Sequence, residues 1–125
     1  DGVLVLAGTG SAAVARRGRE IDLRIGGRGW EYGDEGSGAH LTNDALRRTL
    51  RALDGIGPSS PLADAVAGWL GTTDAGAAAE AAREAAVRDG RGFLVPLVLE
   101  RARGGDPEAR DLFVGAAGWL ARLAT

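Results

Sequence analysis

The sequence contains no cysteine and only one histidine, His40. Without cysteine, the chain forms neither disulfide bonds nor thiolate sites for zinc or iron–sulfur clusters. A single imidazole is too few for a zinc site built from histidines, which needs several protein ligands. We therefore expect no metal centre made from the side chains of this chain.

Long apolar runs are also missing from the sequence. No stretch approaches the ~20 apolar residues that a helix needs to span a bilayer, and no secretory signal pattern opens the chain. The formal net charge of −2 gives no strong positive field for nucleic acid or anionic lipid. These features predict a cytoplasmic protein that binds neither membranes nor nucleic acid.

The sequence also lacks methionine, and it begins with Asp1 and Gly2 directly before an apolar run. We therefore expect it to be a piece of a longer protein. Its 125 residues, 45% of them hydrophobic and 26% charged, are nevertheless typical of a soluble unit large enough to bury a core.

The first part of the chain carries strand patterns. Residues 3–7 form a continuous apolar run with β-branched members, which predicts a strand buried on both faces. Residues 12–16 indicate a second strand, and residues 21–25 alternate apolar and polar side chains as a strand with one wet face does. A short polar turn at residues 17–20 predicts that the last two strands pair as an antiparallel hairpin.

Apolar spacing, capping residues and glycine or proline breaks predict four or five helices in the remainder. Thr73 or Asp74 is the expected cap of the alanine-rich one, and Pro96 fits best in the first turn of the next. The sheet offers too little surface to bury every apolar stripe of these helices. The expected helices begin near residue 41 and run to 54, then cover 61–70, about 74–88, 93–103, and 107 onward.

A glycine-rich stretch at residues 26–38 lies between the strands and the first helix, and Asp34 and Glu35 stand in its second half. Glycine lets the backbone approach a ligand closely because it has no Cβ. One interpretation is that the two carboxylates favour the positive end of the following helix. The other is that Asp34 accepts hydrogen bonds from a polar ligand, and the residue pattern alone leaves both open.

A second candidate site is the turn of Gly8, Thr9, Gly10 and Ser11, which follows the first strand. Its backbone N–H groups could form a concavity for phosphate, and its hydroxyls could donate to phosphoryl or sugar oxygens. Glycine and serine could equally serve turn geometry alone. A P-loop or a Rossmann fingerprint is excluded, since the lysine is missing and a strand follows.

Taken together, residues 4–11, 26–27, 33–38 and 45–55 resemble the N-acetylglucosamine kinase and BadF/BadG-type ATPase family, within the sugar kinase, actin and Hsp70 superfamily. The resemblance implies an α/β fold of the ribonuclease H-like, actin-like ATPase type. It also implies that residues 1–125 are a single partial domain, the first half of a carboxy-terminal lobe, with strands and ligand loops at 1–33 and helices at 34–125. It implies a phosphate-binding role for Gly8, Thr9 and Gly10, and a sugar-binding role for Ser11, Ala12, Gly27, Arg28, Gly29 and Asp34.

The activity that this resemblance implies is transfer of the γ-phosphoryl group of ATP, with Mg²⁺, to a sugar, such as N-acetylglucosamine or glucosamine. The general base of the family would lie upstream of this chain, so no catalytic residue is assigned and the isolated chain should be inactive. A homodimer is a further expectation. The alternatives are a BadF-type ATPase activator and a non-catalytic domain of the same fold that binds a sugar or a partner.

The sequence departs from the family at two places. Arg28 replaces a tryptophan of the family's Gly-Gly-Trp-Gly segment, and Ala39 and His40 replace an aromatic pair. Arg28 could recognise a carboxylate or phosphate, or could be a surface residue whose stem packs on the loop. His40 is expected to be a helix-surface or packing residue and not a general base. Trp30 and Tyr32 could stack on a sugar or fix the loop to the core.

Overall fold

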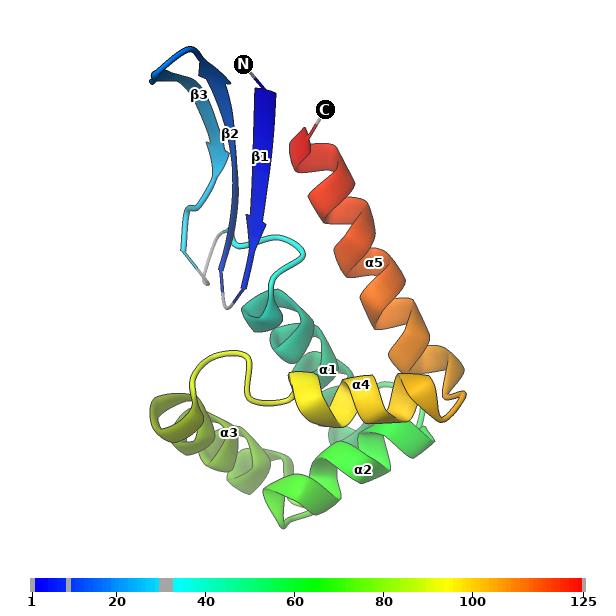
Figure 1. Ribbon diagram of the computed structural model, residues 1–125. Helices are drawn as coiled ribbons and strands as arrows, with labels where there is room; N and C mark the ends of the chain where they lie inside the picture. Colours follow the sequence, from blue (N-terminus) through cyan, green and yellow to red (C-terminus); the bar gives the residue numbers. More distant parts are fainter. Residues whose placement is uncertain (1, 9, 30–32, 125) are drawn as a thin grey trace.

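A three-stranded antiparallel sheet and five helices make up the fold in the computed structural model, which describes residues 2–8, 10–29 and 33–124 (Figure 1). The strands β1 (Gly2–Ala7), β2 (Ser11–Arg17) and β3 (Glu20–Gly26) lie in the order β1-β2-β3. All three predicted strands and the hairpin are confirmed, each with bounds one residue wider at one or both ends. A register shift at Ala15 and Arg16 is the one irregularity in the β2–β3 pairing.

The five helices follow the predicted order closely. The first helix begins at Gly38, three residues earlier than expected, because Ser37 provides its N-cap, and the fourth begins two residues later than expected. Asp74, and not Thr73, caps the alanine-rich helix by accepting a hydrogen bond from Ala77 N. The helices are α1 (Gly38–Asp54), α2 (Pro61–Leu70), α3 (Ala75–Asp89), α4 (Val95–Arg103) and α5 (Pro107–Ala124).

The hydrophobic core lies among the helices. Leu62 and Val66 on α2 are fully buried against Leu94 before α4 and Val98 within it. The remaining buried members come from α1 and α5, so four helices share one core. Helix α5 then continues beyond this core and runs alongside β1 and β2, which connects the helical layer to the sheet (Figure 1).

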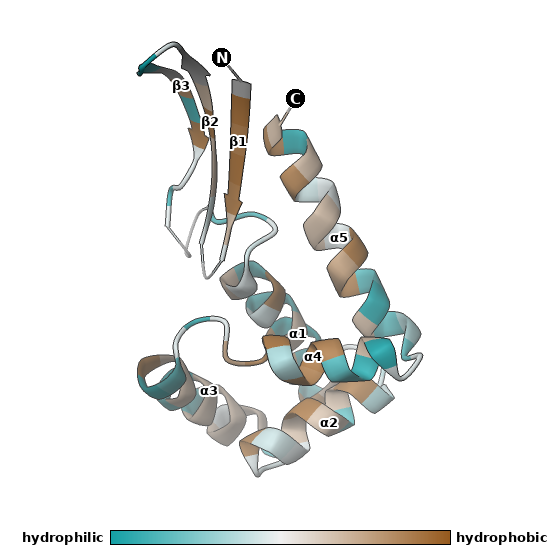
Figure 2. Cartoon of the chain, in the orientation of Figure 1, coloured by the Kyte–Doolittle hydropathy of each residue, from teal (hydrophilic) through white to brown (hydrophobic). Residues whose placement is uncertain are grey.

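Strand β1 is apolar along its length, as the colouring of Figure 2 shows, but the prediction that both its faces are buried is wrong in this structure. Val3, Leu4 and Leu6 are 57%, 55% and 51% exposed. The physical reason is its position: β1 is an edge strand, and among the described residues only β2 and α5 make substantial contact with it.

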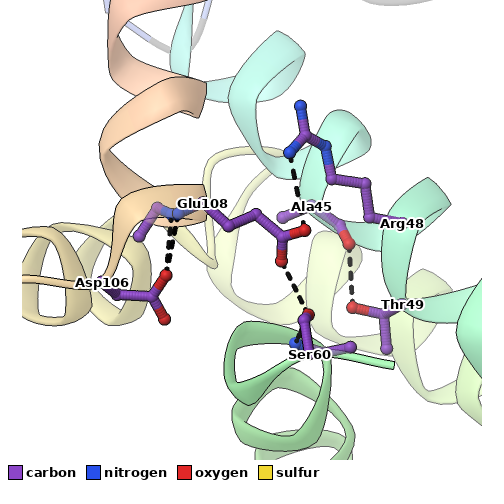
Figure 3. Close-up of polar contacts among 8 residues, drawn as sticks. Ala45, Arg48, Thr49, Ser60, Asp106 and Glu108 are labelled. Carbon is purple, nitrogen blue, oxygen red and sulfur yellow. Dashed lines mark hydrogen bonds and ion pairs between the residues drawn. The ribbon is translucent and has the colours of Figure 1, made fainter. Parts of the chain in front are cut away.

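A polar contact joins the three helices α1, α2 and α5 at the end of the core away from the sheet (Figure 3). Ser60 donates its hydroxyl to Glu108 Oε1 at 2.7 Å and also caps α2, while Arg48 lies 3.7 Å from Glu108 Oε2. Asp106 caps α5 through the N–H groups of Glu108 and Ala109. The contact fixes the lower end of α5, and with it the direction in which α5 approaches the sheet.

Candidate functional site

The two glycine-rich loops predicted as separate sites are in direct contact. Ser11 donates its backbone N–H to Asp34 Oδ1 at 3.0 Å and its hydroxyl to the carbonyl oxygen of Glu35 at 2.5 Å. Gly38 donates its N–H to the Gly8 carbonyl at 2.7 Å. The turn after β1 and the turn before α1 therefore form one site, joined by these hydrogen bonds between described residues.

Asp34 occupies an unusual backbone position. Its φ of 57° is in the left-handed region, which aspartate and asparagine enter more readily than other residues with a side chain. Asp34 O also accepts a hydrogen bond from Ser37 N at 3.0 Å, which closes the turn. Among the described residues, no hydrogen bond to Asp34 Oδ2 is found, so this oxygen is the part of the carboxylate that could accept from a ligand.

The position of Asp34 bears on the helix-end interpretation of the carboxylate pair. Ser37 caps α1, and the first turn of α1 contains no acidic residue. The donor to Asp34 is the N–H of Ser11 on β2, and not an N–H at the start of α1. The Asp34 carboxylate thus bonds to Ser11 in the residue 8–11 turn and not to the start of α1, and its role toward a ligand stays a prediction.

The described residues of the turn at 8–11, namely Gly8, Gly10 and Ser11, form hydrogen bonds within the protein. Gly8 donates its N–H to the Gly10 carbonyl at 2.8 Å, and the Ser11 N–H is taken by Asp34, so these two donors are used within the protein. A Cβ at Gly8 would meet nothing within 4 Å, which leaves open space for a ligand beside this glycine. Thr9 lies outside the described residues, and the phosphate-binding role of Gly8, Thr9 and Gly10 stays a prediction.

The predicted sugar-binding glycines lie at one side of this site. Gly27 donates its N–H to the Ser11 carbonyl at 2.9 Å, and a Cβ at Gly27 would lie 3.2 Å from Cβ of the buried Ala12. Arg28 and Gly29 are exposed. Ser11, Ala12, Gly27 and Asp34 are thus brought together, and the sugar-binding role of the set stays a prediction.

Arg28 lies close to Gly33, the residue before Asp34. A Cβ at Gly33 would come within 2.8 Å of both the Cβ and the N of Arg28, and Gly33 donates its N–H to the Gly29 carbonyl at 2.7 Å. The backbone of Arg28 therefore lies close to Gly33, next to Asp34, and both interpretations of the Arg28 side chain stay predictions. Trp30 and Tyr32 lie outside the described residues.

Two features of the site were not predicted from the sequence. The first is His40, whose Nδ1 accepts a hydrogen bond from Gly36 N at 2.9 Å. The second is a groove of about 590 Å³ beside Gly8 and residues 36–38, with α4 and α5 as its other walls. The groove could have been anticipated from small residues, which let helices approach each other closely. These are Ala116 and Ala117 on α5 and Gly92 before α4.

The described part of the chain lacks two features, a cluster of metal ligands and a membrane-spanning helix. No group of three or more histidine, cysteine, aspartate or glutamate side chains is arranged to hold a metal ion there. No helix in this part combines the length and the apolar character needed to cross a membrane.

Comparison with known sequences gives a consistent result. The sequence model of the BadF/BadG/BcrA/BcrD ATPase family matches residues 1–125. The chain is 33% identical over 112 residues to a glucosamine kinase from Vibrio cholerae, covering 90% of this chain and 37% of that protein. It is 31% identical over 121 residues to an N-acetyl-D-glucosamine kinase from Dictyostelium discoideum, covering 95% of this chain and 38% of that protein. The chain thus spans little more than a third of these relatives.

Solved structures give the same fold. A Chromobacterium violaceum protein assigned as an N-acetylglucosamine kinase superposes with a TM-score of 0.79 at 38% identity, over 98% of this chain and 42% of that one. A Porphyromonas gingivalis protein with the same assignment superposes with a TM-score of 0.64 at 26% identity, over 90% and 38% of the two chains. The short antiparallel sheet followed by helices is therefore the ribonuclease H-like, actin-like ATPase arrangement expected from the sequence.

Proposed function

Because the chain belongs to the BadF/BadG/BcrA/BcrD ATPase family, we propose that the whole protein is an ATP-dependent sugar kinase. Its substrate would be an amino sugar, glucosamine or N-acetylglucosamine, as the names of the Vibrio and Dictyostelium relatives suggest. The chain matches little more than a third of these relatives, so the activity is proposed for the whole protein and not for these 125 residues alone.

One observation carries the proposal: the turn that would face ATP and the carboxylate that would face the sugar are joined by the Ser11–Asp34 hydrogen bond of 3.0 Å. Phosphoryl transfer depends mainly on holding the donor phosphate and the acceptor hydroxyl in line, so a rigid link between the two binding elements is what the chemistry requires. Asp34 Oδ1 is fixed by this link, and Oδ2 would accept hydrogen bonds from sugar hydroxyls.

The other residues have supporting roles in this proposal. Gly8, Thr9 and Gly10 would contact the phosphates, and the open space beside Gly8 fits such a contact. Ser11, Ala12, Gly27, Arg28 and Gly29 would line the sugar site. Mg²⁺ would enter with the ATP phosphates and neutralise their charge. Mg²⁺ is commonly held in this way, by substrate phosphates together with one or two carboxylates.

We propose further that residues 1–125 form the first half of a carboxy-terminal lobe, and that the general base lies upstream of this chain. A cytoplasmic location and a homodimer are parts of the same proposal. The exposed apolar side chains of Val114 and Trp119 on α5 support the dimer, since such side chains gather at interfaces. Size-exclusion chromatography with light scattering on the whole protein would test the dimer.

The test of function is ADP release by the whole protein with a panel of amino sugars, neutral hexoses and sugar acids. We expect glucosamine or N-acetylglucosamine to stimulate ATP turnover more than the other sugars do. If the protein binds ATP and no sugar stimulates turnover, the kinase proposal is wrong. An ATPase activator or a binding domain would then take its place.

Two substitutions at Asp34 sharpen this test. Asp34→Asn keeps an oxygen for the Ser11 N–H and tolerates the left-handed backbone, so the fold should keep its stability. Asp34→Asn removes the charge facing the sugar, and we expect kcat/KM for the sugar to fall about 100-fold. This fall corresponds to the ~3 kcal/mol that a hydrogen bond to a charged group contributes. Asp34→Ala should lose activity similarly and also cost about 2 kcal/mol of stability. Unchanged kcat/KM in Asp34→Asn would contradict the role given to Asp34.

A further inference from the structure

His40 is tied to the turn that carries Asp34. Its Nδ1 accepts the Gly36 N–H at 2.9 Å, and its ring centroid lies 6.3 Å from that of Trp119 on α5. Since a backbone N–H donates to Nδ1, that nitrogen carries no proton, and the ring proton sits on Nε2. This hydrogen bond therefore indicates that the His40 imidazole is the neutral tautomer whose proton is on Nε2.

The turn between Asp34 and Ser37 has contacts on both sides. On one side, Ser11 binds the Asp34 carboxylate and the Glu35 carbonyl oxygen. On the other side, the hydrogen bond from Gly36 to His40 ties the middle of the turn to α1. The turn that carries Asp34 is therefore bonded to Ser11 on β2 and to His40 on α1.

We infer that His40 is a positioning residue for sugar binding: it holds the Asp34 turn in place, and it does so only while its imidazole is neutral. This inference rests on the proposed kinase function. Protonation converts Nδ1 from an acceptor into a donor, so it would face the Gly36 N–H as a second donor and the hydrogen bond would be lost. The turn would then loosen, and the KM for the sugar would rise at acidic pH.

Several charged groups stand on the elements that contact His40. Asp34 and Glu35 stand in the turn itself, and Asp44 follows one helical turn later on the same face of α1. Arg122 on α5 lies 4.9 Å from the centroid of the Trp119 ring that neighbours His40. One carboxylate oxygen, Glu35 Oε2, is buried without a hydrogen-bond partner among the described residues.

The experiment compares two variants with wild type in the whole protein. His40→Asn places an oxygen where Nδ1 stands, because both atoms are one bond beyond Cγ, and this oxygen does not titrate between about pH 5 and pH 8. His40→Ala has no acceptor at any pH. A matched control is Arg47→Ala, a change at an exposed position on the same helix.

At about pH 8 we expect wild type, His40→Asn and Arg47→Ala to have the same KM for the sugar. The KM of His40→Ala should be about tenfold higher, while its kcat stays within about threefold of wild type. At about pH 5 the KM of wild type should rise toward that of His40→Ala, while the KM of His40→Asn changes several-fold less. An equal rise in wild type and His40→Asn would overturn the inference, as would an unchanged KM in His40→Ala.

A second measurement separates failure of this inference from failure of the proposed function. Nitrogen-15 NMR of the whole protein without sugar reports the His40 tautomer and the exchange rate of the Gly36 amide. We expect an unprotonated Nδ1 near pH 8 and faster Gly36 exchange in acid for wild type than for His40→Asn at the same pH. A protonated Nδ1 near pH 8 would overturn the role of His40 whether or not the protein phosphorylates any sugar.

Discussion

At Gly10 a side chain is excluded by contact with Asp34. A Cβ there would lie 2.8 Å from Asp34 Oδ1 and 3.1 Å from Asp34 Cγ. Gly10 is not among the described glycines with positive φ, so the requirement is steric and not conformational. The space in which the carboxylate sits beside Ser11 therefore exists because residue 10 is glycine.

We predict that Gly10→Ala raises the KM for the sugar by about tenfold or more. The new methyl group would push the Asp34 carboxylate away from the Ser11 N–H, which costs a charged hydrogen bond of about 1.5–3 kcal/mol. Steady-state kinetics of the whole protein with the sugar varied at saturating ATP would measure this change.

Gly8→Ala is the matched control, since a Cβ at Gly8 would meet nothing within 4 Å. Its sugar KM should stay within about twofold of wild type. Its KM for ATP should rise, because the methyl group would occupy the open space proposed for phosphate. Equal sugar KM values in the two variants would show that Gly10 does not position Asp34.

The residues of this site could be predicted from the sequence only in part. The order of the motifs around Gly8 and Asp34, and their resemblance to a family, indicated the candidate site residues. The hydrogen bond between Ser11 and Asp34 joins residues 23 positions apart, and no local pattern encodes it. His40 was predicted as a surface or packing residue because a lone histidine shows its acceptor role only when its partner is located.

At the scale of elements, α5 holds the turn before α1 from the side opposite the strands. A Cβ at Gly36 would lie 2.5 Å from the Ala116 carbonyl oxygen and 2.7 Å from Leu120 Cγ. Gly36 also has a φ of 76°, which glycine adopts without strain. The close packing of α5 on this turn thus depends on glycine for two separate reasons.

We predict that Gly36→Ala destabilises the protein by about 3 kcal/mol. About 1–2 kcal/mol comes from the left-handed backbone, and a further 1–3 kcal/mol from the overlap with α5. Gly55→Ala isolates the first contribution, because Gly55 shares the φ of 76° and a Cβ there would meet nothing within 4 Å. It should cost only about 1 kcal/mol. Urea denaturation of both variants gives the comparison, and equal losses would mean that α5 does not press on Gly36.

The elements themselves could be predicted well because their signals are local. Capping residues and proline predicted the ends of α2 to within one residue. The alternation of apolar and polar side chains predicted the ends of β3 equally closely. The start of α1 was missed by three residues because Gly38 disfavours a helix until Ser37 caps it. The burial of β1 could not be predicted, since an apolar run does not reveal whether a strand lies at the edge or the centre of a sheet.

At the scale of the whole molecule, the sheet carries more apolar surface than the described elements cover. Val3, Leu23 and Ile25 share the face that meets Leu123 at the end of α5, yet all three are more than two fifths exposed. Leu4 and Leu6 point to the other face by strand alternation and are about half exposed. An apolar edge strand with exposed side chains on both faces favours coverage by further protein.

We predict that the whole protein covers β1. Leu6→Cys and Ile56→Cys each introduce a thiol into a chain that has no cysteine, and Ile56 lies 79% exposed in the loop between α1 and α2. In the whole protein, a maleimide should label Leu6→Cys at least tenfold more slowly than Ile56→Cys, because covered thiols react slowly. Addition of urea should bring the two rates together. If both thiols react at similar rates in the folded whole protein, β1 stays open there, and its apolar faces are then a surface for another partner.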